Sequence, residues 1–134
     1  MILINEARKK ELIELAKEAS HKAYAPYSKF KVGAALLTSS GKIYTGCNVE
    51  NASYSLTICA ERNAVFQAVA DGQKDIAAIV IYVESDQNFP PCGACRQVLA
   101  EFAQDMPVFI ANRKEVMETT LAALLPEKFS LPNE

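Results

Sequence analysis

The sequence of 134 residues contains no tryptophan, a single histidine and only five glycines, and its net charge is −2. Because this charge is small, the chain has no overall electrostatic attraction to nucleic acid or to an anionic membrane, and neither partner is expected. The longest apolar runs, such as residues 76–83, are far shorter than a membrane span. Residues 1–10 become charged within a few positions. We therefore expect no signal peptide, a cytoplasmic location and no framework of disulfides.

The composition is that of a folded protein. Hydrophobic residues make up 50% of the chain and charged residues 22%, which excludes a disordered chain. A chain of this length buries about two-thirds of its surface on folding, which is enough for a hydrophobic core that needs no disulfide or structural metal. No repeat and no linker rich in proline or glycine divides the sequence, so residues 1–134 are predicted to form one domain.

The hydrophobic pattern predicts alternating helices and strands. Helices are expected at residues 5–24, 57–70, 92–104 and 121–125, and strands at 30–37, 43–49, 76–83 and 107–111, with a short strand or turn before the last helix. Turn residues at 39–42 join the first two strands as a hairpin. Strands that alternate with helices after a hairpin predict an α/β fold, with three layers (α/β/α) and a mixed sheet of about five strands.

The four cysteines need an explanation other than disulfides. Cys59 is expected at the start of the second helix, and Cys92 and Cys95 at the start of the third. Helix N-termini favour thiolates, so two such ends meeting at one point would form a three-sulfur zinc site. Three protein ligands leave one coordination position open, which is typical of catalytic zinc. Glu61 could act there as a general acid and base, provided that Cys59 lies in the turn entering the helix.

Two arginines directly follow these residues. Zinc with three thiolates has a net charge of about −1, which weakens it as a Lewis acid. Arg62 follows Glu61, and Arg96 follows Cys95. A hydrogen bond from either guanidinium to a ligand sulfur would withdraw negative charge and restore the acidity of the metal.

Other interpretations of these residues remain open at this point. Cys92 and Cys95 could form a redox pair at a helix start. Cys47 could complete a closed structural zinc site, although a small core residue is the simpler interpretation. His21 is expected at the surface or at a helix end rather than as a metal ligand.

Two short motifs, Cys59-Ala60-Glu61 and Pro91-Cys92-Gly93-Ala94-Cys95, match the C-x-E…P-C-x-x-C form of the zinc-dependent deaminase signature. Longer segments at 26–28, 30–35, 46–52, 59–62 and 124–129 make the match closer. Together they resemble the cytidine deaminase family, in its small homotetrameric, three-cysteine form. The resemblance extends from about Leu12 to Phe129.

The resemblance implies a hydrolytic enzyme of pyrimidine salvage with one zinc ion per subunit. Its reaction would convert cytidine and 2′-deoxycytidine to uridine and 2′-deoxyuridine with release of ammonia. It assigns Cys59, Cys92 and Cys95 as the zinc ligands. A zinc-activated hydroxide would attack C4 of the base, with Glu61 as the proton shuttle.

The resemblance also assigns substrate contacts. Asn48 and Glu50 match residues that bind the ribose hydroxyls, and side chains two apart on an extended chain do point to the same side. Phe30 matches the aromatic residue that packs on the pyrimidine. The main chain of Ala60 matches the group that reads the edge of the base.

Further assignments depend on assembly. Phe129 resembles the tail aromatic that reaches a neighbour's active site in a homotetramer, where Ala52 and Tyr54 would also contribute. Small departures from the family pattern occur at Ser55 and Pro90. Two alternatives stand beside this hypothesis: a deaminase of a related nucleoside or aminopyrimidine, and a redox or structural-zinc binding protein.

Overall fold

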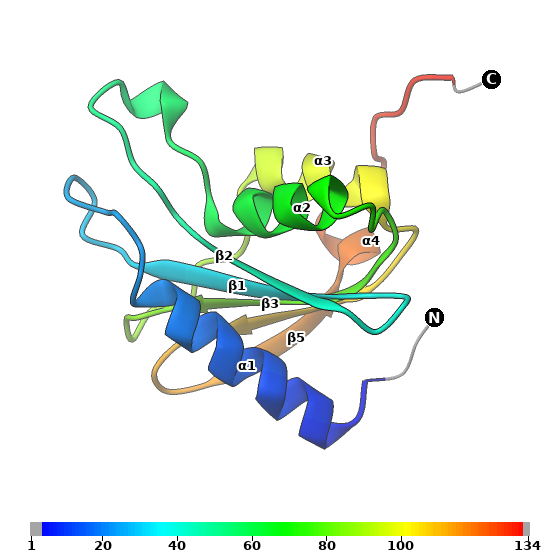
Figure 1. The fold of residues 1–134 in the computed structure, drawn as a ribbon, viewed down its shortest axis with the longest axis horizontal. Helices are drawn as coiled ribbons and strands as arrows, with labels where there is room; N and C mark the ends of the chain where they lie inside the picture. Colours follow the sequence, from blue (N-terminus) through cyan, green and yellow to red (C-terminus); the bar gives the residue numbers. More distant parts are fainter. Residues whose placement is uncertain (1–3, 133–134) are drawn as a thin grey trace.

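A central sheet with helices on both faces forms the fold in a computed structural model that describes residues 4–132 (Figure 1). In chain order the elements are α1 (Glu6–Ser20), β1 (Val32–Thr38), β2 (Ile43–Cys47), the 3-10 helix η1 (Tyr54–Leu56), α2 (Ala60–Ala70), β3 (Ile76–Val83), α3 (Gly93–Phe102), β4 (Pro107–Ala111), β5 (Val116–Thr120) and α4 (Leu121–Leu124). The predicted order of helices and strands is confirmed, and so is the α/β class.

The sheet has five strands in the order β2-β1-β3-β4-β5. β1 pairs antiparallel with both β2 and β3, β3 pairs parallel with β4, and β4 pairs antiparallel with β5. The sheet is therefore mixed, as predicted. All eight residues of β3 are buried, because apolar layers cover both faces of this central strand.

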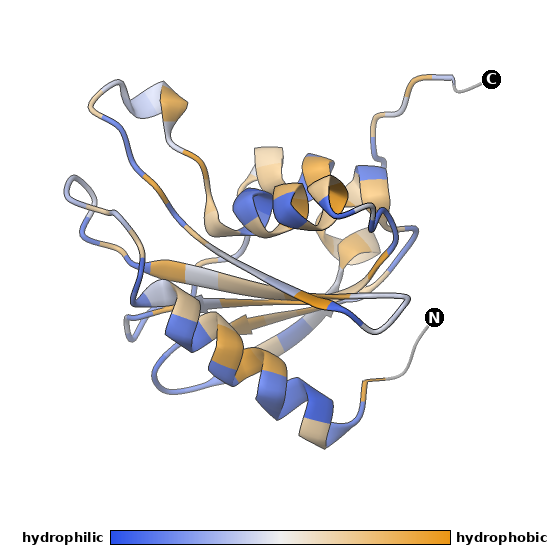
Figure 2. Ribbon diagram, in the orientation of Figure 1, coloured by the Kyte–Doolittle hydropathy of each residue, from blue (hydrophilic) through white to orange (hydrophobic). Residues whose placement is uncertain are grey.

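Two apolar clusters separate the three layers. One lies between the sheet and the helices α2, α3 and α4, and includes Ala64, Ile79 and Leu99. The other lies between the sheet and α1, and includes Leu12 and Val80. Figure 2 shows the matching pattern on α1, where hydrophobic and hydrophilic residues alternate around the helix. None of the described helices combines the length and apolar character needed to cross a membrane.

The two largest differences from the predicted helix bounds lie at the end of α1 and at the start of α2, and the pairing of one residue, Val49, explains both. α1 ends at Ser20 rather than near Tyr24, because Tyr24 forms a parallel bridge with Val49. α2 begins at Ala60 rather than at residue 57, because Ile58 forms an antiparallel bridge with the same Val49. Backbone committed to these bridges is extended and cannot also be helical. The chain around Val49 thereby ties three distant segments together.

Glycine at one strand position lets α2 approach the sheet closely. A Cβ atom on Gly46 would lie 2.5 Å from the backbone nitrogen of Ala64 and 2.6 Å from the carbonyl oxygen of Ala60. No other residue type fits there without moving the helix. The first turn of α2 is consequently fixed against the end of β2, next to the segment that carries Asn48 and Glu50.

Candidate active site

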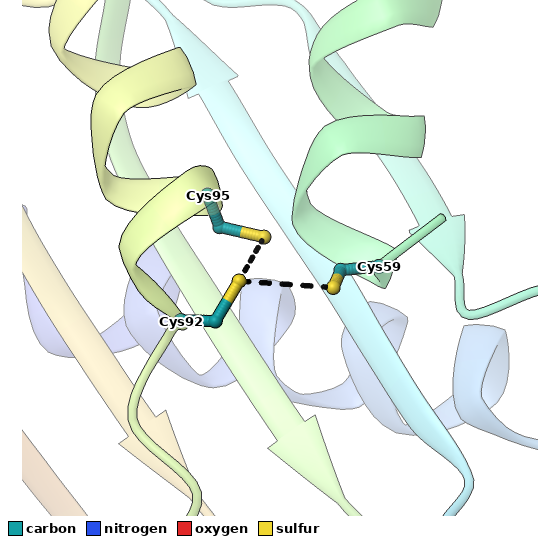
Figure 3. Close-up of side chains that lie close together, drawn as sticks. All are labelled: Cys59, Cys92 and Cys95. Carbon is teal, nitrogen blue, oxygen red and sulfur yellow. Dashed lines mark hydrogen bonds between the residues drawn. The ribbon is translucent and has the colours of Figure 1, made fainter. Parts of the chain in front are cut away.

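Three cysteine sulfurs meet where α2 and α3 begin (Figure 3). Cys59 is the N-cap residue of α2, Cys92 is the N-cap residue of α3, and Cys95 lies buried in the first turn of α3. The Sγ atom of Cys92 lies 3.9 Å from that of Cys59 and 3.5 Å from that of Cys95. All three sulfurs lie within 4.8 Å of one another.

These distances fit a single tetrahedral zinc ion. With Zn–S bonds of about 2.3 Å, the sulfurs of a tetrahedral site are about 3.8 Å apart. The two distances measured from Cys92 lie on either side of that value. Three soft sulfur ligands favour zinc over harder cations, and they leave one coordination position free. The donor set and its spacing therefore fit one catalytic zinc ion.

Cys47 and His21 lie outside the cysteine cluster, although Cys47 is half-buried and not the core residue that was predicted. Cys47 ends β2, half-buried, and is not among the three cysteines that form the cluster. Burial raises the pKa of its thiol. His21 follows α1 at the surface, and its Nε2 atom lies 3.3 Å from Oε2 of Glu84. Within residues 4–132 the closed four-cysteine site is not formed.

The two arginines differ in what they contact. Arg62 Nη2 donates a hydrogen bond to Cys59 Sγ at 3.4 Å. Hydrogen bonds from the Cys95 thiol and from Arg62 lower the pKa of Cys59. Arg96 instead donates to two backbone carbonyls, those of Pro91 at 2.7 Å and Leu124 at 2.9 Å.

The position of Arg96 differs from the expected contact with a sulfur. Successive side chains in a helix point about 100° apart, so the residue after Cys95 faces away from the cluster. Its guanidinium holds the backbone of Pro91, directly before Cys92, and that of Leu124 at the end of α4. Arg96 therefore supports the backbone around the site rather than a sulfur atom.

Glu61 lies in the first turn of α2 and is only 4% exposed. Cys59 is outside the regular helix, with extended backbone angles (φ −72°, ψ 157°). This is the geometry that allows Cys59 and Glu61 to face the same space although they are two positions apart. Burial raises the pKa of the Glu61 carboxyl to about 7, against an opposing hydrogen bond from its own backbone N–H.

A cavity of about 250 Å³ opens beside the sulfurs. It brings together most of the residues that the sequence assigned to the substrate. Its lining consists of Ser28, Phe30, Val32, Asn48, Glu50, Tyr54, Thr57, Cys59, Ala60, Glu61, Ile81, Phe89, Pro90 and Cys92. Apolar walls with a few convergent polar groups are typical of a small-molecule site.

Glu50 is the second buried carboxylate of this cavity, with 4% of its surface exposed. Its Oε1 atom accepts hydrogen bonds from the backbone N–H groups of Tyr27 (3.0 Å) and Ser28 (3.1 Å). Its Oε2 atom accepts from the hydroxyls of Ser28 (2.5 Å) and Tyr54 (3.4 Å). Burial favours the neutral acid, but these hydrogen bonds outweigh it, and the pKa of Glu50 lies below its usual value.

Asn48 also lines the cavity, and its side chain already has backbone partners. Its Oδ1 atom accepts from the N–H of Val32 at 2.9 Å, and its Nδ2 atom donates to the carbonyl of Phe30 at 2.8 Å. An amide has two donors and two lone pairs, so one of each remains. Asn48 therefore holds the Phe30 segment in place and keeps capacity for a ligand.

Two predicted residues lie outside the cavity of their own chain. Ala52 is exposed in the loop before η1, and the Phe129 side chain is 67% exposed on the tail. The tail is tied to α3 by a hydrogen bond from Gln97 Nε2 to the Phe129 carbonyl at 2.9 Å. Within one chain, neither residue joins the substrate cavity.

Among the lining residues for which no role was predicted, Ser28 and Phe89 make contacts that shape the cavity. Ser28 orders both Glu50 and the next segment, since its hydroxyl also accepts from the N–H of Phe30 at 3.1 Å. Phe89 packs on Phe30, with ring centroids 4.8 Å apart. Their sequence signals are slight: a serine two positions before Phe30, and a lone aromatic residue before the two prolines that precede Cys92.

Known proteins similar to this chain are deaminases. Residues 6–111 match the family model described as "Cytidine and deoxycytidylate deaminase zinc-binding region". A cytidine deaminase of Sporosarcina psychrophila is 52% identical over 122 residues, which cover 90% of each protein. The crystal structure of cytidine deaminase from Burkholderia pseudomallei matches with a TM-score of 0.86 and 48% identity, over 94% of this chain and 100% of that one. A blasticidin-S deaminase of Bacillus cereus is 34% identical over 128 residues, 90% of this chain and 91% of that protein.

Proposed function

The chain belongs to the cytidine and deoxycytidylate deaminase family, and we propose that it hydrolyses cytidine and 2′-deoxycytidine to the corresponding uridines and ammonia. One structural observation supports this proposal in addition to membership of the family. Two of the three clustered cysteines line the same cavity as the buried carboxylates Glu61 and Glu50. A metal site, a proton carrier and a hydroxyl acceptor are thus available to one small molecule. The reaction would serve pyrimidine salvage.

Cys59, Cys92 and Cys95 would hold one zinc ion per subunit. When bound, zinc supplies a Lewis acid that lowers the pKa of water enough for it to react at neutral pH. Arg62 supports this chemistry through its hydrogen bond to Cys59 Sγ, which draws charge from a sulfur ligand. The Arg96 contacts with Pro91 and Leu124 would keep Cys92 in position.

Glu61 is the residue proposed to move protons. It would take a proton from the attacking water and deliver it to N3 of the pyrimidine. It would then take a second proton, from the hydroxyl now on C4, and pass it to the departing amino group. Support comes from its place in the lining of the cavity and from its near-complete burial. General acid and base groups must lie within hydrogen-bond reach of the atoms that they serve, and this cavity is small enough for that.

The remaining lining residues would bind the nucleoside. Glu50 and Asn48 are proposed to bind the ribose hydroxyls, because a carboxylate is a strong acceptor for a diol. Phe30 would pack on the face of the base, and the backbone of Ala60 would read its edge. An anionic substrate group near Glu50 would be repelled, which favours an unphosphorylated ribose.

We also propose that the active site is completed in a homotetramer. Phe129 lies outside its own cavity and is largely exposed, so it could act only on the site of another copy. Ala52 and Tyr54 lie on the loop that would meet that copy. Other large apolar side chains are exposed as well: Tyr24, Tyr27, Val49, Leu56 and Phe66. Free thiols at the site suit a reducing compartment, which supports the cytoplasm as its location.

An assay of cytidine turnover by ultraviolet absorbance, with and without a metal chelator, tests this proposal. We expect turnover that the chelator removes and that added zinc restores, with about one zinc ion per chain. A chain without zinc that reversibly forms a Cys92–Cys95 disulfide would instead be a redox protein. Blasticidin S serves as a parallel substrate, because of the relative at 34% identity. Faster turnover of blasticidin S than of cytidine would favour that alternative.

A further inference from the structure

A second aromatic ring belongs to the wall of the cavity. Phe89 lies in the loop between β3 and α3, three residues before Cys92. Its ring centroid is 4.8 Å from that of Phe30, and the planes are inclined at 53°. Both rings line the cavity, together with Pro90. Aromatic pairs at this distance and tilt attract each other beyond simple burial of area.

Phe30 needs such a partner. It precedes β1, and 41% of its surface is exposed. Its backbone is held by Asn48 and Ser28, but backbone hydrogen bonds do not select a side-chain rotamer. A half-exposed ring with no neighbour would lose rotamer freedom when a base packs on it, and this loss weakens binding. Contact with Phe89 removes part of that freedom in advance.

Phe89 is itself held from outside the site. The turn between β4 and β5 is tied to the loop before Phe89 through Asn112, which is 6% exposed. Asn112 Nδ2 donates to Asn88 Oδ1 at 2.9 Å and to the Asp86 carbonyl at 3.4 Å. Arg113 Nε lies 3.0 Å from Asp86 Oδ1. Asp86 and Asn88 are therefore anchored to the turn after β4, and this fixes the loop directly before Phe89.

We propose that Phe89 is a positioning residue for the pyrimidine ring: it orients Phe30 before the nucleoside binds and so strengthens binding without taking part in the reaction. The inference rests on the proposed function, in which Phe30 packs on the base. Its consequence is an effect confined to binding. If Phe89 only supported the loop, its replacement would instead displace Cys92. The zinc content and kcat would then fall.

The first test is Phe89→Ala, with KM and kcat for cytidine, zinc content and Tm measured together. Aromatic pair energies predict a rise in KM of about two- to twelve-fold. We expect kcat to stay within about two-fold of the original and zinc content to be unchanged. Phe89→Leu, which keeps apolar contact, should recover part of the loss in KM. An unchanged KM, or a fall in kcat and zinc content at unchanged KM, would overturn the inference.

The second test is a double-mutant cycle with Phe30→Ala. If Phe89 acts through Phe30, then Phe89→Ala should change KM by less than about two-fold when Phe30 is already alanine. Additive effects would overturn the inference. Turnover of cytidine by the unaltered chain distinguishes a failure of the proposed function from a failure of this inference. If there is no turnover, both are overturned. Turnover together with an additive cycle overturns the inference alone.

Discussion

Glu50 and Glu61 are two carboxylates of one cavity, each only 4% exposed, in opposite surroundings. Glu50 accepts hydrogen bonds from two backbone N–H groups and two hydroxyls, which hold its pKa below the usual value. Burial dominates at Glu61 and raises its pKa to about 7. One carboxylate therefore stays charged, and the other can exchange a proton.

In the proposed function this difference would separate substrate binding, at Glu50, from proton transfer, at Glu61. A carboxylate held by four donors keeps its charge and its orientation, and a ligand hydroxyl would replace the longest of the four contacts, that with Tyr54 at 3.4 Å. A desolvated carboxylate beside clustered thiols gains and loses a proton near neutral pH, which general acid and base catalysis requires. Each carboxylate can be altered separately, and the two should then fail in different ways.

Glu61→Gln should have the largest effect. It removes the proton carrier but keeps the shape of the side chain, so kcat should fall by roughly 10²–10⁴-fold or more. Zinc content and KM should change little. Steady-state kinetics and metal analysis measure these quantities, with Glu118→Gln on exposed β5 as the matched control. Turnover close to that of the control would contradict the role given to Glu61.

Glu50→Gln should have a smaller effect, mainly on KM. Hydrogen bonds to a charged group contribute about 1.5–3 kcal/mol, so kcat/KM for cytidine should fall about ten- to hundred-fold. Zinc content should stay unchanged, because Glu50 does not belong to the cysteine cluster. A loss confined to kcat, at unchanged KM, would show that the two carboxylates share one role.

Ser28→Ala should have a milder effect on the same residue. It removes the hydroxyl that donates to Glu50 and accepts from the N–H of Phe30, while the backbone donors remain. We expect kcat/KM to fall about five- to ten-fold, which is less than a full hydrogen bond to a charged group contributes, because the two backbone donors still hold the carboxylate. Ser53→Ala, in the exposed loop before η1, is the matched control. Equal kinetics in the two variants would contradict the ordering role of Ser28.

The smallest effect concerns acid stability. The pKa of Glu50 is lowered on folding, so the unfolded chain binds more protons between the two pKa values, and the stabilisation is lost as pH falls. The free energy of unfolding of Ser28→Ala should therefore differ most from that of the original chain above about pH 4.3, the usual carboxyl pKa. Urea titrations at several pH values should show this difference shrinking in more acidic solution. A difference that grows toward low pH would contradict the assignment.

Much of the sulfur cluster could be predicted from the sequence, because its residues lie close together in the chain at two helix starts. Cys92 and Cys95 are three positions apart at a helix start, and Cys59 and Glu61 are two apart at another. What spacing could not decide was whether Cys59 lay outside the regular helix. The bridge between Val49 and Ile58 decides this by keeping the chain extended up to α2.

The surroundings of Glu50 could not be predicted in the same way. Its donors at Tyr27 and Ser28 lie 23 and 22 residues earlier in the chain and reach it through the pairing of Tyr24 with Val49. A single sequence does not reveal such long-range contacts, because many partners satisfy the same hydrogen-bonding groups. The close approach at Gly46 was missed for the same reason, since it depends on the packing of α2 on β2.

The most direct measurement of the division between the carboxylates compares cytidine with 2′,3′-dideoxycytidine, which lacks the 2′- and 3′-hydroxyls and keeps the 5′-hydroxyl. The kcat/KM of the original chain, Glu50→Gln and Glu61→Gln is measured on each substrate. We predict that the deficit of Glu50→Gln largely disappears on the dideoxy substrate, whereas the deficit of Glu61→Gln is the same on both. A Glu50→Gln deficit that persists in full without the hydroxyls would contradict the account.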